Sequence, residues 1–398
     1  MKPKKEILAV IPARGGSKSI PRKNLVPLAG RPLLSHSIQT ALDTPEISRV
    51  VVSTDDPRIG AVALESGAQV VWRPAEISTD SSSSESALLD ALEQLENQDG
   101  YHPDLVVFLQ CTAPLTAVED IRGTIRALED ERADSALAAA PFHYFIWRLD
   151  EKGQAQGINH NKDYRPLRQE RAPQFIETGA VYVMQADGFK KSRHRFFGKT
   201  TIYIMPAERC FEIDEYADLQ IAEMLLRKKM RSNRRSSIPS PVEALVLDFD
   251  GVFTDNRALV FQDGAEAVYC DRGDGWGLRR LKETGVPVLV LSSEPNPVVG
   301  ARCAKLGLEC RHGVEDKLET LLGWLREKEI NPGKTVYLGN DMNDLGCLQA
   351  AGCGAVVADA HSGVRSAAKI ILEHPGGRGA IRELVDLILE VNKGAGDA

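Results

Sequence analysis

The chain is organised around the stretch ILAVIPARGGSKSIPRKN, which occupies residues 7–24. Its first five residues, Ile7–Ile11, are continuously apolar and end abruptly in turn-forming residues, which predicts a buried strand of a parallel sheet. The loop after that strand would lie at the carboxyl edge of the sheet, where open α/β sheets bind their ligands. A doubly wound α/β domain with a ligand in this loop is therefore expected.

The loop combines small residues with positive charge. Gly15 and Gly16 allow backbone N–H groups to come close to an anion. Four cations can neutralise a polyphosphate here, and they are Arg14, Lys18, Arg22 and Lys23. The loop matches neither G-x-G-x-x-G nor G-x-x-x-x-G-K-[ST], so the two common nucleotide motifs do not apply. We expect it to bind a nucleoside triphosphate, and the alternative is a solvated basic loop.

Further apolar runs alternate with helical patterns along the first half of the chain. Strands are expected at Val50–Ser53, Gln69–Trp72, Leu105–Leu109 and Ala136–Ala140. Helices are expected at Leu33–Leu42, Pro57–Glu65, Ser84–Leu95 and Val118–Glu129. This alternation predicts a mostly parallel sheet with helices on both faces. Thr54, Asp55 and Asp56 follow the first of these strands, and this polar group is expected to supply the N-cap of the helix that begins near Pro57.

Length and composition limit the class of protein. At 398 residues the chain is long enough for two or three domains. The net charge of −7 argues against a nucleic-acid partner, so anionic substrates must be held by local groups of Arg and Lys. No apolar run is long enough to span a bilayer, and MKPKKE leads straight into a strand, so we expect a cytoplasmic protein with no membrane partner. Seven cysteines without C-x-x-C spacing indicate reduced thiols.

The sequence IPARGGSKSIPRKNLVPLAGRPLL, residues 11–34, resembles the opening of the acylneuraminate (nonulosonate) cytidylyltransferases. These enzymes make a CMP-sugar and pyrophosphate from CTP and a free 2-keto-3-deoxy sugar acid. The resemblance implies in-line attack of the sugar's anomeric hydroxyl on the α-phosphorus, with charge on the phosphoryl oxygens stabilised by Arg14, Lys18 and Lys23. The contacts to CTP that it implies are Ala13, Arg14, Gly15, Gly16, Asn24, Arg73 and Ser82.

Two later motifs follow the family pattern with departures. LQCTAPLT, residues 109–116, resembles LQPTSPLR and would place Gln110 against the sugar, although cysteine and threonine replace the first proline and the arginine. YRPLRQERAPQFIETGAVYVM, residues 164–184, resembles an R-R-Q…N-G…Y pattern. This similarity implies further sugar contacts from Arg168, Gln169 and Thr178. The alternative for these arginines is surface ion pairing.

A metal site is expected within FEIDEYADLQIAE, residues 211–223. Alternate residues of an extended segment face the same way, so Glu212 and Asp214 would share one side. Mg²⁺ binds through one or two carboxylates together with phosphate oxygens, which this spacing suits. The family usually has Asp-x-Asp here.

A second domain is expected after the basic, Ser- and Pro-containing stretch LLRKKMRSNRRSSIPSPVE, residues 225–243. We predict domains at 1–228 and 243–398, joined by a linker over 229–242. ALVLDFDGVFTDN, residues 244–256, then restarts the pattern with a buried strand that ends in acidic residues. One of its carboxylates, Asp248 or Asp250, can attack phosphorus while the other protonates the leaving oxygen.

Further motifs follow in the order found in the haloacid dehalogenase superfamily of phosphatases, which the second domain resembles. They are LSSE at residues 291–294, Lys317, and GNDMND at residues 339–344. The catalytic roles implied are Asp248 as nucleophile, Asp250 as acid/base, and Ser292 and Lys317 as phosphate ligands. The Mg²⁺ ligands implied are Asp248, Asp250, Asn340, Asp341 and Asp344.

The stretches GVFTDN, RGDGWG and HPGGRGAIREL look like the capless branch that hydrolyses 3-deoxy-D-manno-octulosonate 8-phosphate and usually forms tetramers. Two departures bear on this similarity. Asn340 stands where many relatives have aspartate. Ser293-Glu294 stands where relatives have Gly-Arg, and the acidic side chain of Glu294 disfavours the octulosonate substrate in favour of a nine-carbon sugar acid phosphate.

We therefore expect a bifunctional, Mg²⁺-dependent enzyme with two doubly wound Rossmann-like α/β domains. The N-terminal cytidylyltransferase domain would use CTP and a sugar acid, and the C-terminal domain would remove the 9-phosphate of that acid. A homotetramer is the assembly that the resemblance implies. The alternatives are a C-terminal domain that serves only tetramerisation, and a CMP-octulosonate synthetase.

Overall fold

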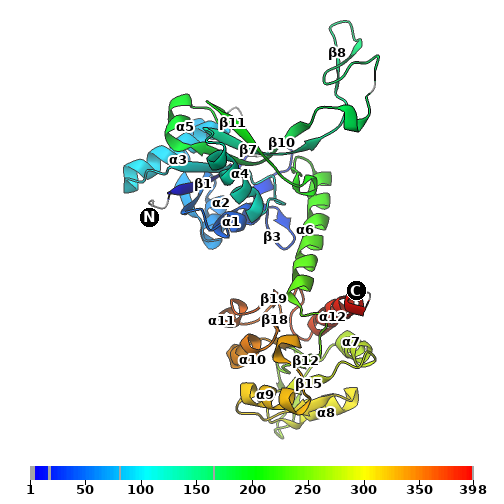
Figure 1. Ribbon diagram of the computed structural model, residues 1–398. Helices are drawn as coiled ribbons and strands as arrows, with labels where there is room; N and C mark the ends of the chain where they lie inside the picture. The colour runs from blue at the N-terminus through cyan, green and yellow to red at the C-terminus, as the bar shows by residue number, and fades with distance from the viewer. Residues whose placement is uncertain (1–4, 17–18, 80–81, 165, 397–398) are drawn as a thin grey trace. The chain divides into compact units, whose positions relative to one another are not determined.

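The computed structural model describes residues 5–16, 19–79, 82–164 and 166–396. The chain divides into two compact units between Arg227 and Lys228 (Figure 1). Each unit has its own central sheet, of seven strands in the first and six in the second. Both units are of the α/β class, which confirms the predicted fold class.

The first unit contains a mixed sheet in the order β11-β7-β10-β6-β1-β4-β5. Strand β10 pairs antiparallel with both β6 and β7, whereas the other neighbouring strands pair in parallel. The expectation of a mostly parallel sheet is thus correct except at β10, whose direction the sequence does not reveal. The strands are β1 (Ile7–Pro12), β4 (Arg49–Thr54), β5 (Gln69–Trp72), β6 (Leu105–Leu109), β7 (Ser135–Phe142), β10 (Gln174–Gln185) and β11 (Thr200–Ile204).

Helices cover both faces of this sheet. Ile7, Ala9 and Ile11 pack with α1, α2 and α4, while Leu8 and Val10 pack on the opposite face with α3 and α5. Because β1 is buried on both faces, its residues are continuously apolar, as its sequence predicts. The helices are α1 (Leu33–Leu42), α2 (Pro57–Glu65), α3 (Ser84–Asp99), α4 (Val118–Asp130) and α5 (Ala186–Ser192).

Helix α2 is capped by Asp56, one of the three residues from which a cap was expected. Its Oδ1 accepts a hydrogen bond from the backbone N–H of Arg58 at 2.8 Å. The Arg58 guanidinium, hydrogen-bonded to the same carboxylate, lowers the pKa of Asp56 to about 2. The cap therefore stays ionised well below neutral pH.

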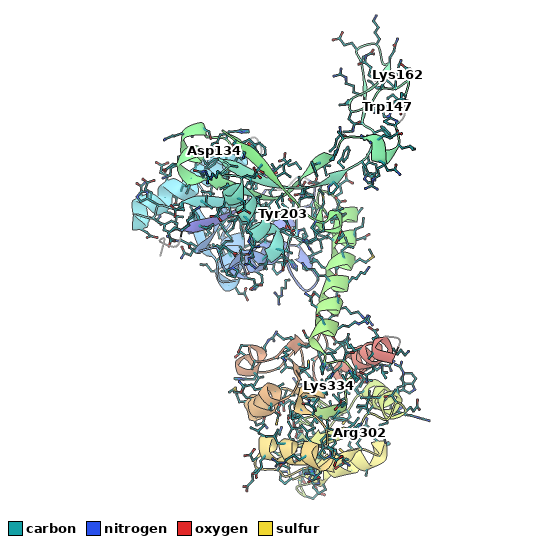
Figure 2. All side chains as sticks on the ribbon, viewed as in Figure 1. Asp134, Trp147, Lys162, Tyr203, Arg302 and Lys334 are labelled. Carbon is teal, nitrogen blue, oxygen red and sulfur yellow. The ribbon has the colours of Figure 1, made fainter. Side chains whose placement is uncertain are left out.

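An arm projects from the first unit between β7 and β10 (Figure 1). It contains the ribbon of β8 (Trp147–Leu149) and β9 (Ala155–Gly157) and the short helix η3 (Arg168–Glu170). Figure 2 places Trp147 and Lys162 near its end. The arm exposes large apolar side chains, including Tyr144, Trp147 and Leu149. A second small ribbon, β2 (Pro27–Leu28) with β3 (Arg31–Pro32), follows the glycine loop.

Helix α6 (Tyr216–Ser237) crosses the boundary between the units. It extends to Ser237 and ends just before Ile238-Pro239, where the proline disfavours helical backbone. Most of the stretch 229–242, predicted as a linker, is therefore helical. Within the second unit, Arg234 contacts Glu373 at 2.9 Å and Glu383 at 3.1 Å, so this part of α6 packs as a member of that unit.

The second unit contains a fully parallel sheet in the order β16-β15-β12-β17-β18-β19. Its strands are β12 (Ala244–Leu247), β15 (Val288–Leu291), β16 (Glu309–Arg311), β17 (Thr335–Gly339), β18 (Cys353–Val356) and β19 (Ile370–Ile371). Its helices are α7 (Arg272–Lys282), α8 (Pro297–Leu306), α9 (Lys317–Glu327), α10 (Leu345–Ala350), α11 (Ser362–Arg365) and α12 (Ala380–Gly396). A short ribbon of β13 (Leu259–Val260) and β14 (Glu266–Ala267) follows the loop after β12. The central strands β12, β15 and β17 thus end side by side, which brings their loops to one edge.

Candidate active sites

The glycine loop after β1 is fixed by neighbouring backbone. Ala13 N–H donates to the Ser53 carbonyl at 2.9 Å, and Gly15 N–H donates to Asp55 Oδ1 at 2.9 Å. A Cβ at Gly15 would lie 2.9 Å from the Cβ of Asp56, so only glycine permits this approach. Gly16 has open space around its α-carbon. The predicted residue Lys18 lies outside the described residues.

The predicted CTP contacts come together around Thr79. The Arg14 guanidinium donates to the Thr79 carbonyl at 3.1 Å, and Asn24 donates to the Arg14 carbonyl at 3.1 Å. The Ser82 hydroxyl lies 2.8 Å from that of Thr79. Arg73 is nearby in sequence and donates to the carbonyl of Ser53 at 2.8 Å. Burial lowers the pKa of Arg73, which remains a cation at neutral pH.

The acidic segment meets the basic loop. Lys23 Nζ donates to the Ile213 carbonyl at 2.7 Å and lies 3.3 Å from Asp214 Oδ1. Glu212 and Asp214 lie in irregular backbone between β11 and α6, where an extended segment was expected. A cation beside the glycine loop and two carboxylates thus occupy one region. Lys23 and Ile213, which join the two segments, lie 190 residues apart in sequence.

Glu212 belongs to a second cluster with Gln110. Thr112 donates to Glu212 Oε1 at 3.1 Å. In the amide orientation that satisfies both of its ends, Gln110 donates to the Gly179 carbonyl at 2.8 Å and to Glu212 Oε1 at 3.2 Å. Burial raises the pKa of Glu212, and the neighbouring Asp214 adds to the effect. Sequence reasoning missed the part played by Gly179, whose φ of +66° suits glycine.

Three predicted sugar contacts do not join this cluster. Thr178 is buried and its hydroxyl donates to the Ala138 carbonyl at 2.9 Å, so it serves the sheet and does not face the cluster. Arg168 and Gln169 lie in η3 on the arm. Arg168 lines a separate cavity of about 200 Å³, whose other walls come from residues 141–143 and 171–175. The sequence gives no sign that the chain between β7 and β10 leaves the sheet, so it does not reveal that Arg168 and Gln169 lie on the arm. Their contact with the sugar stays a prediction.

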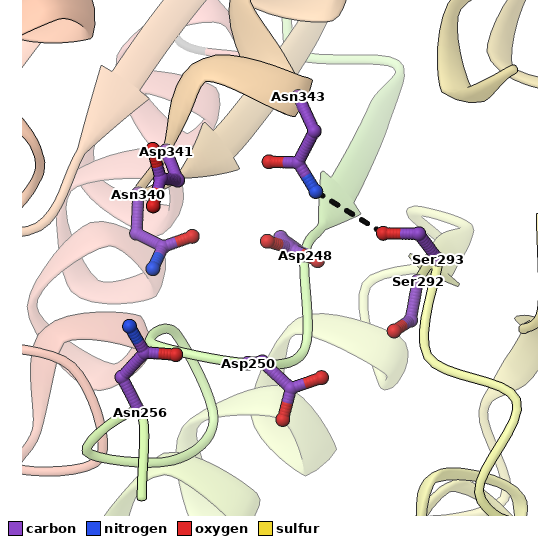
Figure 3. Close-up of a pocket in the computed structure, with 8 residues that line it drawn as sticks. All are labelled: Asp248, Asp250, Asn256, Ser292, Ser293, Asn340, Asp341 and Asn343. Atoms are coloured by element: carbon purple, nitrogen blue, oxygen red, sulfur yellow. Dashed lines mark hydrogen bonds between the residues drawn. The ribbon is translucent and has the colours of Figure 1, made fainter. Parts of the chain in front are cut away.

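The second site lies at the carboxyl ends of β12, β15 and β17 and contains a cavity of about 300 Å³ (Figure 3). Asp248 and Asp250 follow β12, and Ser292 follows β15. An Asn343 amide donates to the Ser293 hydroxyl at 3.1 Å across the site. The lining residues are Asp248, Asp250, Asn256, Ser292, Ser293, Asn340, Asp341 and Asn343.

Lys317, the first residue of α9, ties two carboxylates together. Its Nζ lies 2.8 Å from Asp248 Oδ1 and 2.8 Å from Asp344 Oδ1, and all three side chains are buried. Burial opposes the charge on Lys317, but Asp248 and Asp344 outweigh it and raise the pKa of the ammonium. Burial and the charge of Asp344 raise the pKa of Asp248.

Asp344 was predicted as a metal ligand, and its contacts contradict that role. Its Oδ1 accepts from Lys317 and from the buried Tyr337 hydroxyl at 2.6 Å. Its Oδ2 accepts from the backbone N–H groups of Asn340 at 2.8 Å and of Asp341 at 3.3 Å. With both oxygens engaged and no exposed surface, Asp344 positions Lys317 and the loop after β17. From the sequence GNDMND alone, the last aspartate cannot be told apart from a metal ligand.

The other predicted ligands fit Mg²⁺. Asp248, Asp250, Asn340 and Asp341 all line the same cavity and offer only oxygen donors from the carboxylates and one amide. Gly251 leaves room for the Asn340 side chain, because a Cβ at residue 251 would lie 1.9 Å from the Asn340 amide nitrogen. The described residues contain no cluster of three or more His, Cys, Asp and Glu side chains placed to hold a metal. Mg²⁺ needs only one or two carboxylates with water and phosphate oxygens, so these residues suffice.

Ser292 and Glu294 border the cavity on the β15 side. The buried Ser292 hydroxyl accepts from the Glu294 N–H at 3.0 Å. Glu294 lines an adjoining cavity of about 340 Å³ together with Asp250 and Asn256. Burial raises the pKa of Asp250, and the charge of Glu294 adds to the effect, which suits a carboxyl that must hold a proton.

Comparisons with known proteins identify a family for each unit. A family model described as Cytidylyltransferase matches residues 8–235, more than half of the chain. A model described as haloacid dehalogenase-like hydrolase matches residues 308–383. No helix in the described part of the chain is long and apolar enough to cross a membrane.

Similar proteins cover one or both units. N-acylneuraminate cytidylyltransferase A of Danio rerio is 32% identical, with 98% of this chain and 90% of that protein covered. Pseudaminic acid cytidylyltransferase of Campylobacter jejuni is 32% identical over 55% of this chain and 96% of its own length. Among solved structures, 3-deoxy-D-manno-octulosonate 8-phosphate phosphatase from Moraxella catarrhalis is 26% identical in sequence to this chain, with a TM-score of 0.39. The match covers 43% of this chain and 95% of that protein. This chain belongs to the N-acylneuraminate cytidylyltransferase family and carries a haloacid dehalogenase-like hydrolase domain at its C-terminal end.

Proposed function

We propose that the chain is a bifunctional enzyme that acts on one sugar acid in two consecutive steps. The C-terminal unit hydrolyses the 9-phosphate of a nine-carbon 2-keto-3-deoxy sugar acid, of the sialic acid or deaminated type. The N-terminal unit then joins the free acid to CMP from CTP and releases pyrophosphate. The observation that carries the proposal is the buried contact of Lys317 with Asp248. A domain needed only for assembly has no use for a buried ammonium beside a carboxylate at the edge of a cavity.

In the N-terminal unit, the glycine loop and its cations receive the triphosphate. Arg14 and Lys23 stabilise negative charge on the phosphoryl oxygens as the sugar's anomeric hydroxyl attacks the α-phosphorus and pyrophosphate leaves. Gln110 orients the sugar from the end of β6. Glu212 and Asp214 are the residues that would hold Mg²⁺, which would neutralise phosphate charge.

In the C-terminal unit, Asp248 is oriented for attack. Its Oδ1 is held by Lys317 and by the N–H of Phe249 at 2.7 Å, which leaves the other oxygen to attack phosphorus. A bond forms between that oxygen and phosphorus, the bond to the sugar oxygen breaks, and Asp250 gives the sugar oxygen a proton. Asp250 then takes a proton from the water that hydrolyses the aspartyl phosphate. Asp248, Asp250, Asn340 and Asp341 are the residues that would hold Mg²⁺, which would offset phosphate charge.

Assembly and location follow as further parts of the proposal. A homotetramer is supported by apolar side chains that the second unit exposes, and they are Leu259, Val260, Phe261, Tyr269 and Trp276. A cytoplasmic location is supported by seven cysteines that are all free. The same exposed surface favours the second candidate, in which the C-terminal unit only assembles tetramers. The third candidate is a synthetase that prefers octulosonate.

Phosphate release by the full chain separates these candidates. With Mg²⁺ and a nine-carbon sugar acid 9-phosphate, the native chain should release inorganic phosphate, and Asp248→Asn should not. Transfer of CMP to the free acid, measured as pyrophosphate release, should be equal in both and serves as the folding control. No phosphate from either chain would favour the assembly candidate, and faster CMP transfer to octulosonate than to nine-carbon acids would favour the third.

A further inference from the structure

Three cavities of the second unit adjoin one another. The cavity at Asp248 shares Asp250, Asn256 and Ser293 with the cavity of about 340 Å³. That second cavity shares Arg257 with a third cavity of about 210 Å³. The shared residues place the three cavities side by side, in a row that runs from the nucleophile to the third cavity. A substrate longer than phosphate itself can therefore extend along it.

The third cavity presents two arginines, Arg257 and Arg378, from two separate loops. Both side chains are exposed to solvent. Within the described part of the chain, neither guanidinium has a hydrogen bond or an ion pair, although Asp255 and Asp359 line the same cavity. Two planar cations that face one space and have no protein partner can each bind a carboxylate through two hydrogen bonds.

The loop that carries Arg378 is fixed to the catalytic loop. Gly377 N–H donates to the Val252 carbonyl at 3.0 Å, and Gly376 N–H donates to Asp359 Oδ1 at 2.9 Å. A Cβ at Gly376 would lie 1.9 Å from the Gly251 carbonyl, so glycine is required for this close contact. Backbone contacts thus fix the position of the Arg378 loop relative to the residues around Asp250. A fixed distance of this kind lets a binding group select substrates of one length.

We infer that the third cavity is a carboxylate subsite of the phosphatase, in which Arg257 and Arg378 hold the end of the substrate far from phosphorus. This inference rests on the proposed phosphatase function and names the residues that would recognise the acid end of its substrate. The aspartates of the cavity have a matching role. Asp255 lines this cavity beside the two arginines, and a carboxylate there can accept hydrogen bonds from substrate hydroxyls. A polyhydroxylated acid satisfies both kinds of group.

The test compares two esters in the full chain. The first is a nine-carbon sugar acid 9-phosphate, and the second is p-nitrophenyl phosphate, which has no carboxylate. The quantity measured is the ratio of kcat/KM for the first ester to that for the second. Arg257→Ala and Arg378→Ala should each lower this ratio by roughly 10- to 100-fold, the size expected for the loss of charge-assisted hydrogen bonds, mainly through KM.

Two further variants make the result specific. Arg378→Lys keeps the charge without the planar pair of donors and should recover part of the ratio. Arg326→Ala removes an exposed arginine from α9, an element that supplies none of the lining residues, and should leave the ratio unchanged. If the native chain hydrolyses both esters and the ratio is the same in both alanine variants, the subsite is refuted and the phosphatase stands. If the native chain hydrolyses neither ester, the proposed phosphatase and the subsite fail together.

Discussion

The ammonium of Lys317 lies 2.8 Å from Oδ1 of Asp248, and both side chains are at least 95% buried. The two residues come from different elements, the start of α9 and the end of β12, so the contact depends on the fold of the whole second unit. Lys317 takes up one oxygen of the carboxylate and leaves the other for chemistry. It also binds Asp344, which in turn holds the loop after β17. The acidic site is therefore organised around one buried cation.

Loss of the proposed acid should depend on the leaving group. Asp250→Asn removes the proton donor, so hydrolysis of the sugar ester should fall by roughly 100- to 10,000-fold. p-Nitrophenolate leaves without a proton, so hydrolysis of p-nitrophenyl phosphate should fall much less. The measurement is kcat for both esters in native and variant chains. Equal losses on both esters would argue that Asp250 serves only to hold the metal.

Removal of the buried cation should destabilise the second unit. Lys317→Met leaves Asp248 and Asp344 buried without their partner, which should cost about 3–5 kcal/mol of unfolding free energy. Urea unfolding of the C-terminal unit measures this change. The control is Lys328→Met, which removes an exposed ion pair of 3.1 Å to Glu309 and should cost at most about 1 kcal/mol. Similar losses in the two variants would mean that the Lys317 cluster contributes nothing special to stability.

The close contact at Gly179 predicts a loss of CMP transfer. A Cβ there would lie 2.8 Å from the end of the Gln110 side chain and 3.1 Å from Glu212. Gly179→Ala should displace both and lower kcat/KM for CMP transfer by roughly 10- to 100-fold. Gly153→Ala provides a matched control, because Gly153 also has positive φ but no atom lies within 4 Å of its Cβ position. The account of the Gln110 cluster is wrong if the two variants have the same activity.

Lys23 should matter more for chemistry than for folding. Its side chain is mostly buried against Ile213 and Asp214, at the point where the basic loop meets the acidic segment. Lys23→Met should reduce kcat/KM for CMP transfer by roughly 100- to 1,000-fold, because a stabilising charge is lost at the phosphates. Lys5→Met, which removes the exposed ion pair with Glu129, should have no such effect. Unchanged transfer in Lys23→Met would remove this lysine from the site.

Stability of the second unit should depend on pH through Asp274. Burial raises the pKa of Asp274 from 3.8 to about 6, and one of its oxygens has no partner among the described residues. The folded chain therefore binds this proton more tightly than the unfolded chain, so stability should fall between pH 4 and pH 6 by roughly 3 kcal/mol and stay lower above that range. Urea unfolding across this range in the native chain and in Asp274→Asn measures the effect.

Asp274→Asn cannot ionise and should lose this pH dependence. Asp263→Asn, in the exposed turn between β13 and β14, should keep it. An identical pH profile in native and Asp274→Asn chains would contradict the assignment.

The sequence predicts much of the fold because its strongest patterns are local. β1 is buried on both faces, and its sequence is therefore a continuous apolar run. The cap of α2 depends only on Asp56 and the nearby backbone of Arg58. The antiparallel direction of β10 and the helical course of α6 up to Ser237 depend on tertiary contacts that no local pattern contains.

The candidate sites divide in the same way. Asp248 follows a strand within its motif, so its place in the cavity could be predicted. Asp344 is also an aspartate in a motif that follows a strand. Its two oxygens, however, accept hydrogen bonds from Tyr337, Lys317 and the backbone, and these contacts are visible only in the structure. The position of Arg168 on the arm could not be predicted, because the departure of the arm from the sheet has no signature in sequence.

One measurement tests the central claim, that the two units act in sequence on one sugar acid. The full chain is given a nine-carbon sugar acid 9-phosphate, CTP and Mg²⁺, and inorganic phosphate, pyrophosphate and CMP-sugar are followed with time. We predict that phosphate appears first, that unphosphorylated CMP-sugar follows, and that Asp248→Asn stops both while still using the free acid. Absence of phosphate from the native chain, or CMP transfer to the phosphorylated acid by Asp248→Asn, would contradict the account.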